Sequence, residues 1–248
     1  MFDLTKRVAL VTGAGQGVGG GIARMLARQG AAVAVNDLHV ERAEQMAAAI
    51  RTMGGTACGV AFDVTDGAAV AVGVRAIEAT LGPIDVLVNN AGVPEGMGVA
   101  AFRDLDPSQW RQYVDLNLYG VLNCTKAVID GMCARRFGRV ITISSGAGQI
   151  GIRLGISLYG AGKGGAIAFM RHLAIEVARD GVTANTLALG LMSNQVDTPE
   201  TAPLAGAVPV GRLSTPDEVG AAVVYLASTE AGWMTGQTIG LNGGSVTS

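Results

Sequence analysis

A glycine-rich stretch near the start of the chain limits the fold more than any other feature of the sequence. Residues 12–19 read TGAGQGVG; they follow the short apolar run 7–11, and from Ile22 onward apolar residues recur at helical spacing. A strand, a glycine turn and a helix in this order form the first unit of a parallel sheet, because parallel strands need a crossover helix between them. We therefore expect further strand and helix pairs along the chain.

The same alternation continues to the end of the chain. Each expected strand is nearly all apolar, which is typical of a parallel sheet covered by helices on both faces. The sequence predicts an α/β fold: a three-layer Rossmann fold whose doubly wound parallel sheet has about seven strands. Beyond the first unit, the expected strands are 32–36, 56–61, 84–88, 139–144, 182–187 and 237–241, and the expected helices are 41–53, 67–80, 107–134, 159–179 and 216–228.

Length and composition indicate one domain and argue against several classes of partner. The 248 residues contain no linker or change of composition, so we expect 1–248 to form a single domain. A net charge of −2 without a basic run argues against nucleic acid and anionic membrane surfaces. The absence of a long apolar run or signal peptide predicts a soluble cytoplasmic protein. The three cysteines lack metal-ligand spacing, so no metal site is expected.

The glycine turn also predicts a binding site. Between a first strand and a first helix, glycines let backbone N–H groups approach a pyrophosphate, and the helix N-terminus adds partial positive charge. A purely structural turn is the alternative in a chain with 37 glycines, but the position after the first strand favours a phosphate-binding loop. The expected contacts come from Gly13, Gly15, Gln16, Gly17, Val18 and Gly19.

Residues at the ends of other strands extend this site. Asp37 ends the second strand, where a carboxylate accepts hydrogen bonds from adenosine ribose hydroxyls and repels a 2′-phosphate, so NAD is favoured over NADP. A helix N-cap is the alternative role for Asp37, and the two roles are compatible. Asp63 and Val64 are expected beside the adenine, and Asn90, Ala91 and Gly92 follow the fourth strand at the same edge of the sheet.

Tyr159 and Lys163 form the pair with the clearest chemical meaning. Four residues apart on a helix, they project from one face, and an ammonium near a phenol favours the phenolate. Ser145, at the end of an apolar strand, would hold a substrate oxygen beside the phenol. Taken alone, a tyrosine and a lysine at this spacing are most often an ordinary helix-surface pair.

Together, these motifs resemble the classical short-chain dehydrogenase/reductase family. The glycine turn, Asp37, NNAG at 89–92, Asn117 in DLNLYG, Ser145 and YGAGK at 159–163 occur in the family's order, and the resemblance covers the whole chain. It implies one dinucleotide-binding and catalytic domain that acts as an NAD-dependent oxidoreductase on a secondary alcohol or a ketone.

The resemblance also implies roles for four residues. Tyr159 is the acid/base, and Ser145, rather than its neighbour Ser144, orients the same substrate oxygen. Lys163 binds the nicotinamide ribose and lowers the pKa of Tyr159, and Asn117 holds a water through its main chain. Tyr159 and Lys163 thus contact both substrate and cofactor.

One departure from the family lies after the sixth expected strand. The family has Pro-Gly there and this chain has Leu189-Gly190, which leaves the backbone less constrained. The resemblance implies a substrate lid over 189–212 with cofactor contacts from Gly190 and Met192. The family's threonine is absent, and Ser193 or Asn194 would replace it.

The sequence gives less information on the substrate than on the cofactor. Apolar residues expected at the pocket, among them Ile150 and Ile152, favour a mostly apolar alcohol or ketone. A 3-oxoacyl-thioester reductase, for acyl carrier protein or coenzyme A, is the alternative. Arg136 occupies one of two positions expected to hold a base beside the active site for an acidic carrier, but Asp180 occupies the other. A non-catalytic NAD-binding regulator is a further alternative.

Glycines 160, 162, 164 and 165 crowd the helix that carries the tyrosine. Because glycine is costly inside a helix, they predict close backbone contact with a cofactor or a partner subunit. The resemblance implies a homotetramer.

Overall fold

A computed structural model describes residues 1–193 and 202–247 of the chain. At its centre lies a sheet of seven parallel strands in the order β3-β2-β1-β4-β5-β6-β7, which confirms the predicted Rossmann fold. The strands are β1 (Val8–Val11), β2 (Ala32–Asp37), β3 (Thr56–Ala61), β4 (Val86–Asn89), β5 (Gly138–Ser145), β6 (Val182–Leu189) and β7 (Thr238–Leu241).

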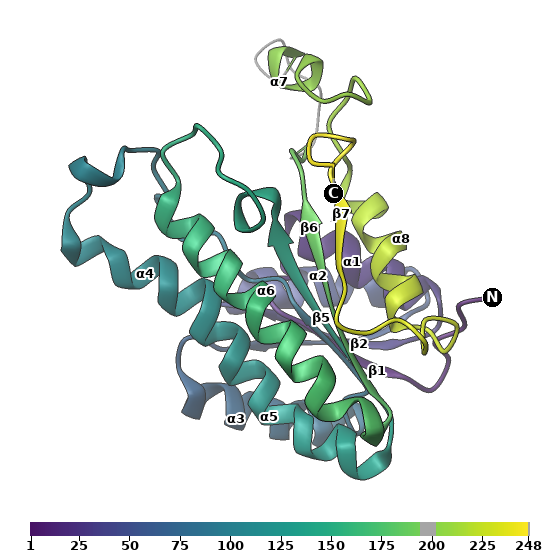
Figure 1. Cartoon of the computed structure of the whole chain (residues 1–248). Helices are drawn as coiled ribbons and strands as arrows, with labels where there is room; N and C mark the ends of the chain where they lie inside the picture. The colour runs from purple at the N-terminus through teal and green to yellow at the C-terminus, as the bar shows by residue number, and fades with distance from the viewer. Residues whose placement is uncertain (194–201, 248) are drawn as a thin grey trace.

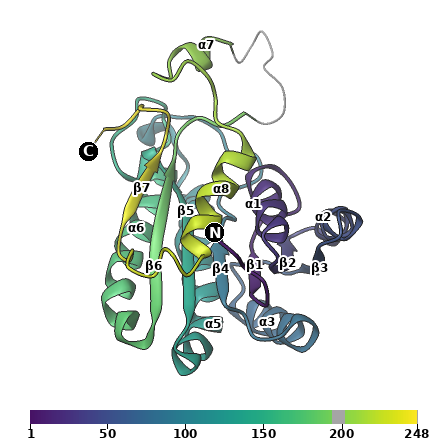
Figure 2. The same cartoon turned by 90° about the vertical axis from the view of Figure 1, so that its right-hand side faces the viewer.

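Helices cover both faces of the sheet (Figures 1 and 2). Successive residues of a strand point to opposite faces, so Ala9 and Val11 of β1 pack in one apolar cluster and Val8 and Leu10 in the other. The first cluster contains side chains of α1 (Gly17–Arg28), α2 (Val40–Thr52) and α8 (Pro216–Ala227), and the second contains those of α3 (Gly67–Leu81), α5 (Gly120–Arg135) and α6 (Ser157–Val177). Among the helices of the described residues, none has the length and apolar character that a membrane crossing requires.

The order of the strands reverses between β1 and β4, which are neighbours in the sheet but not in the chain. In a doubly wound sheet, ligands bind in the crevice that this reversal opens at the carboxyl ends of the strands. The glycine turn after β1 and the ends of β2, β4 and β5 all lie at this edge. In Figure 1, the arrowheads of β5 and β6 point toward the side of the molecule on which the short helix α7 (Ala202–Gly206) stands.

The helix predicted over 107–134 is interrupted. A π-helical turn, Asp115–Tyr119, joins α4 (Trp110–Val114) to α5 and contains Asn117. Such a turn accommodates one extra residue per turn, and it often marks a functional site.

The segment predicted to be an irregular lid begins later than expected. Leu189 is the last residue of β6 and pairs with Ser145 on one side and Leu241 on the other. Leucine keeps the backbone N–H that proline lacks, so the strand can continue through this position. Within 189–212, α7 forms a short helix, and residues 194–201, including the predicted contact Asn194, lie outside the described residues.

The glycines of α6 contact this chain itself. A side chain at Gly160 would meet the carbonyl oxygen of Ala147 at 2.8 Å, and one at Gly162 would meet that of Tyr113 at 3.0 Å. At these positions the backbone of α6 thus approaches other segments of the same chain closely. This close approach places Tyr159 and Lys163 firmly against the end of β5.

Candidate active site

The glycine turn is held in shape by the end of β4. Gly13 and Gly17 have φ angles of 59° and 56°, a region that favours glycine. Asn90 donates from Nδ2 to the carbonyl oxygens of Thr12 and Gly13, at 2.9 and 3.0 Å. Helix α1 begins at Gly17 without a side-chain cap, so its first N–H groups are available to an anion. The turn therefore fits the pyrophosphate of a dinucleotide.

Asp37 is fixed beside the same turn. Its side chain is buried, and its carboxylate accepts hydrogen bonds from the backbone N–H groups of Gly15 and His39, both at 3.1 Å. The N-cap of α2 is His39, so Asp37 does not have the alternative role of capping that helix. A side chain at Gly15 would collide with Asp37 and with Arg42, which explains the glycine there.

One crevice of about 720 Å³ brings the predicted cofactor residues together. Gly15 is the one predicted residue that does not line the crevice. Its N–H instead donates a hydrogen bond to the carboxylate of Asp37. The predicted residues that do line the crevice are Gly13, Gln16, Gly17, Val18, Gly19, Asp37, Asp63, Val64, Asn90, Ala91, Gly92, Tyr159, Lys163, Gly190 and Met192.

Further residues outside the recognised motifs line this crevice, among them His39, Arg42 and Glu95. Arg42 is half-buried in the first turn of α2, at the end of the crevice that holds Asp37. Its position, five residues after the end of β2 and in the first turn of the next helix, is the signal from which it was predictable. His39 Nε2 and Glu95 Oε1 lie 3.1 Å apart and connect the loops after β2 and β4.

Ser145 and Tyr159 meet at the end of β5. The Ser145 hydroxyl accepts a hydrogen bond from the N–H of Ala147 at 3.2 Å, and Ser145 and Tyr159 both line the crevice. Ser144 donates instead to the carbonyl oxygen of Lys163 at 3.2 Å and is buried, so its hydroxyl is occupied within the fold. This difference supports the choice of Ser145 over Ser144.

The electrostatics of this pair differ from the expectation. Burial raises the pKa of Tyr159, and the hydrogen bond with Ser145 only partly opposes that rise. Burial also lowers the pKa of Lys163 to about 8. Lys163 Nζ lies 5.7 Å from the centre of the Tyr159 ring and donates to the carbonyl oxygen of Ile143. In the protein alone, the pKa of Tyr159 thus moves up rather than down, because the cost of burying a phenolate exceeds the opposing effect of Ser145.

Asn117 lies behind the crevice rather than in its wall. Its side chain is fully buried, donates from Nδ2 to the carbonyl oxygen of Tyr113 at 2.9 Å, and leaves Oδ1 without a partner. A side chain at Gly92 would collide with Lys163 Nζ and lie 2.9 Å from Asn117 Oδ1. The amide oxygen and the ammonium thus face the same small space, which suits a water molecule bound between polar groups.

The ends of the lid segment are joined at its base. Met192 pairs with Ser214 in a parallel bridge, and the N–H of Ser193 donates to the carbonyl oxygen of Ser214 at 2.8 Å. The N–H of Gly190 donates to the carbonyl oxygen of Leu241 at 3.0 Å. Gly190 and Met192 are thereby held at the crevice although the usual proline is absent.

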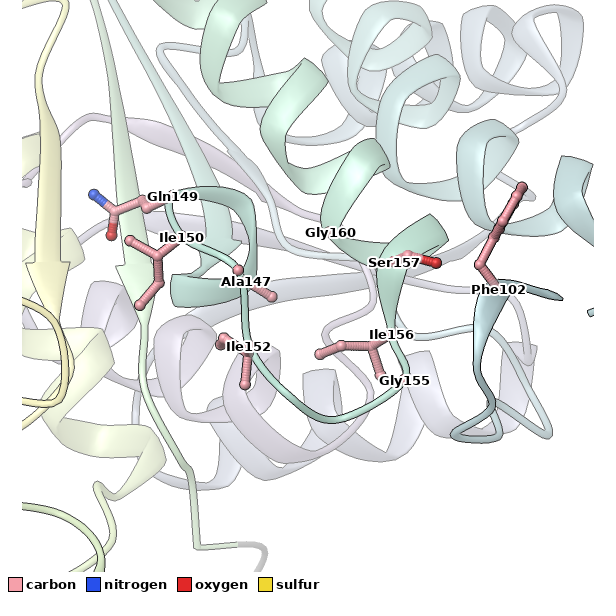
Figure 3. A pocket seen from close by; sticks show the side chains of 10 residues that line it. Phe102, Ala147, Gln149, Ile150, Ile152, Gly155, Ile156, Ser157 and Gly160 are labelled. Atoms are coloured by element: carbon pink, nitrogen blue, oxygen red, sulfur yellow. The ribbon is translucent and has the colours of Figure 1, made fainter. Parts of the chain in front are cut away.

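A second cavity, of about 420 Å³, lies between the segment that leads from β5 into α6 and Phe102 (Figure 3). Ile150 and Ile152 line it, in agreement with their expected place at a pocket. Arg136 and Asp180, in contrast, are wrongly placed by the expectation that they flank the active site. They precede β5 and β6 at the amino ends of those strands, the opposite edge of the sheet from Ser145. Asp180 is therefore no argument against a carrier-bound substrate in this chain.

Comparisons with known proteins agree with this geometry. The family described as short chain dehydrogenase matches residues 7–204. The 3-oxoacyl-[acyl-carrier-protein] reductase FabG of Vibrio harveyi is 38% identical over 248 residues, covering 98% of both chains. The acetoacetyl-CoA reductase of Shinella zoogloeoides is 40% identical over 244 residues, covering 96% of this chain and 98% of the relative.

A solved structure is also similar over nearly the whole chain. The gluconate 5-dehydrogenase of Burkholderia cenocepacia J2315, in complex with NADP and tartrate, superposes with a TM-score of 0.90 at 36% identity, covering 98% of this chain and 96% of that one. With the family match and these relatives, the conclusion is that this chain belongs to the short-chain dehydrogenase/reductase family and is an oxidoreductase that acts on a CH–OH group with a nicotinamide cofactor.

Proposed function

We propose that this protein interconverts a secondary alcohol and a ketone, with Tyr159 as proton donor and acceptor. The observation that carries the proposal is that Ser145, at the carboxyl end of β5, lines the same crevice as Tyr159 and the buried Lys163. Two hydroxyls that face one point can bind a single substrate oxygen, and only one of them needs to transfer its proton.

The residues of the site divide this work. In ketone reduction, Tyr159 gives its proton to the carbonyl oxygen while Ser145 donates a hydrogen bond to the same oxygen. Lys163, with a pKa of about 8, is about nine-tenths protonated at pH 7 and stabilises the phenolate that remains. The nicotinamide cofactor supplies or accepts the hydride. Asn117 Oδ1 and Lys163 Nζ hold a water that returns a proton to Tyr159.

We infer that NAD is the preferred cofactor. The buried carboxylate of Asp37 is held at the adenosine end of the crevice, where a 2′-phosphate would meet a second negative charge. Two observations oppose this preference: Arg42 offers a cation nearby, and the similar gluconate 5-dehydrogenase structure contains NADP. Asp37 outweighs Arg42 here because its carboxylate is fixed by two backbone N–H groups, whereas the arginine is half-exposed.

The leading substrate class is a 3-oxoacyl thioester. Two relatives similar over nearly their whole length bear the names of reductases for such thioesters, one on acyl carrier protein and one on coenzyme A. The cavity lined by Phe102, Ile150 and Ile152 is compatible with an acyl group. A 3-oxoacyl thioester is thus favoured over the free apolar alcohol or ketone that the sequence predicts. The reaction at the carbonyl group is the same for both substrate classes.

A direct assay tests the proposal. Purified protein is given NADH or NADPH with 3-oxoacyl thioesters of coenzyme A and with simple ketones, and the loss of nicotinamide absorbance is followed. Turnover is expected with thioesters, faster with NADH, and Tyr159→Phe should lower it by about 10²- to 10⁴-fold without weakening cofactor binding. Equal turnover by the variant would exclude Tyr159 as the acid, and binding of cofactor without turnover of any substrate would indicate a regulator instead.

A further inference from the structure

An exposed pair of side chains crosses the cofactor crevice and takes no part in the proposed reaction. His39 Nε2 lies 3.1 Å from Glu95 Oε1, and both residues line the crevice. Because a carboxylate only accepts hydrogen bonds, the imidazole donates from Nε2. A neutral imidazole with its proton on Nε2 makes this hydrogen bond as a charged one does, so the contact does not require a protonated histidine.

The two residues come from different sides of the crevice. His39 is the N-cap of α2 and follows the end of β2, whereas Glu95 lies in the loop after β4. Strand β1 separates these two strands in the sheet, and neighbouring strands lie about 4.8 Å apart, so the ends of β2 and β4 are roughly 10 Å apart. The pair thus spans the carboxyl end of β1, where the glycine turn begins.

This position lies across the expected path of a bound dinucleotide. With its pyrophosphate on the glycine turn, the adenosine extends toward Asp37 and the nicotinamide toward Tyr159 and Lys163. These three residues line the same crevice as His39 and Glu95. The cofactor would therefore run between the two walls that the pair joins.

The loop that carries Glu95 has few other attachments. In the part of the chain that the structure describes, residues 93–99 make one hydrogen bond to another segment, the one between Glu95 and His39. A second hydrogen bond closes a turn inside the loop. A Cβ at Gly96 would meet nothing within 4 Å among the described residues, so the loop has room to move outward there.

The strength of the pair suits a contact that opens and closes. The side chains of His39 and Glu95 are 40% and 78% exposed. Pairs exposed to this degree favour their closed form by roughly 1.4-fold to fivefold. Such a pair is closed for most of the time, and it still opens spontaneously.

We propose that His39 and Glu95 form a strap over the cofactor crevice, which opens to admit the dinucleotide and closes again over it. The strap slows entry and release of the cofactor alike, so it sets the rate of cofactor exchange rather than the affinity. The inference concerns the nicotinamide cofactor alone and does not depend on which substrate the protein takes.

Stopped-flow fluorescence of NADH, and again of NADPH, with the purified full chain measures both rate constants. His39→Ala and Glu95→Ala each remove one side of the strap, and each should raise the association and dissociation rate constants by roughly twofold to sixfold. The dissociation constant, which is their ratio, should change by less than about twofold. Combining the two substitutions should add nothing, because either one alone leaves the strap open.

A purely electrostatic effect of the two residues would give a different result. Removal of the Glu95 carboxylate takes a negative charge away from an anionic dinucleotide, which raises the association rate and lowers the dissociation rate. Removal of a histidine cation has the opposite effects on both rates. A strap instead makes the two variants alike, with both rates higher in each.

Glu44→Ala is the matched control. Glu44 is also a carboxylate of α2 that forms an ion pair, with Arg51, but neither of these two residues lines the crevice. Its loss should leave both rate constants unchanged. An unchanged dissociation rate in Glu95→Ala, opposite effects in the two strap variants, or additive effects in the double variant would overturn the inference.

The measurement contains no substrate, so it separates this inference from the proposed reaction. If the rates respond as expected but no ketone or thioester is turned over, the proposed function fails and the strap inference stands. If substrates are turned over while the rates do not respond, only the strap inference fails. Both strap side chains are exposed, and that of His39 makes no cap hydrogen bond to α2, so we expect the variants to fold as the wild type does.

Discussion

Lys163 donates a hydrogen bond of 2.8 Å from Nζ to the carbonyl oxygen of Ile143, and so connects α6 to the strand that ends at Ser145. The lysine side chain is buried, and burial lowers its pKa to about 8. The fold therefore keeps a cation in its interior at neutral pH, at a cost in stability that the proposed role of Lys163 would explain. A loss of stability of this kind is common at functional sites.

The first prediction concerns this buried charge and stability. Between about pH 8 and 10.5 the folded protein has lost the Lys163 proton while the unfolded chain keeps it, so the residue's contribution to stability rises with pH. Relative to Lys163→Met, the wild type should gain up to about 3 kcal/mol over this range. Tm of both proteins without cofactor, measured by calorimetry at pH 7, 8.5 and 10, checks this. A difference in Tm that is constant or falls with pH would contradict it.

The second prediction concerns the pH dependence of the reaction. Because burial raises the pKa of Tyr159, the phenol stays protonated at neutral pH. Reduction should be nearly independent of pH until the ordinary phenol value of about 10 is passed, whereas oxidation should rise by up to tenfold per pH unit below it. Since the Ser145 hydrogen bond lowers this pKa, Ser145→Ala should move the oxidation limb to higher pH. Full pH profiles of kcat/KM in both directions are the measurement, and a limb near pH 7 would refute the raised pKa.

The parts of the fold that depend on periodicity were predictable from the sequence. The apolar runs marked every strand, and the residue types after β1, β2 and β4 placed Asp37 and Asn90 at one edge of the sheet. These inferences succeed because strand ends in a parallel sheet share an edge whatever the details of packing.

Features that depend on contacts distant in sequence were not predictable in this way. The extra residue in the turn around Asn117 leaves the apolar spacing of the helix almost unchanged, so no pattern reveals it. The direction of the Tyr159 pKa depends on how deeply two neighbours are buried, which spacing does not give. Arg136 and Asp180 were misplaced because residues before a strand lie at the edge opposite the site.

The third prediction concerns the choice of cofactor. Asp37→Asn keeps an oxygen that can accept from Gly15 but removes the negative charge, so NADPH should gain about 10- to 100-fold in kcat/KM relative to NADH. Adding Arg42→Ala to this variant should remove much of the gain, because the arginine is then the charge that faces the 2′-phosphate.

Asp63→Asn is the matched control for this series. Asp63 lines the same crevice, but its carboxylate accepts hydrogen bonds from Thr65 and lies after a different strand. It should leave the ratio of the two cofactors within about twofold, a shift of under ~0.5 kcal/mol. A wild-type preference for NADPH, or an unchanged ratio in Asp37→Asn, would show that Asp37 does not set the specificity.

The fourth prediction compares two neighbouring glycines of α1. A Cβ at Gly21 would lie 2.6 Å from the backbone carbonyl carbon of Pro216, the first residue of α8. A Cβ at Gly20 would come too close only to the flexible terminal methyl of Met46, since its next neighbour, the carbonyl oxygen of Ala14, is at an ordinary contact distance of 3.5 Å. Alanine at either position adds up to about 1 kcal/mol of helix propensity. At Gly20 the flexible methionine can move, so Gly20→Ala should be neutral or slightly stabilising. At Gly21 the backbone of α8 must shift, so Gly21→Ala should cost about 1–3 kcal/mol in spite of that gain.

Thermal unfolding of the two variants measures this contrast. For a chain of this length, 1 kcal/mol corresponds to roughly 2–4 °C in Tm, so Gly21→Ala should melt clearly below Gly20→Ala. Because α8 follows the bridge between Met192 and Ser214, a shift of α8 should also move that base of the lid and raise KM for the substrate. Equal Tm values for the two variants would contradict the prediction. They would mean that α8 can move away from α1 without a loss of stability.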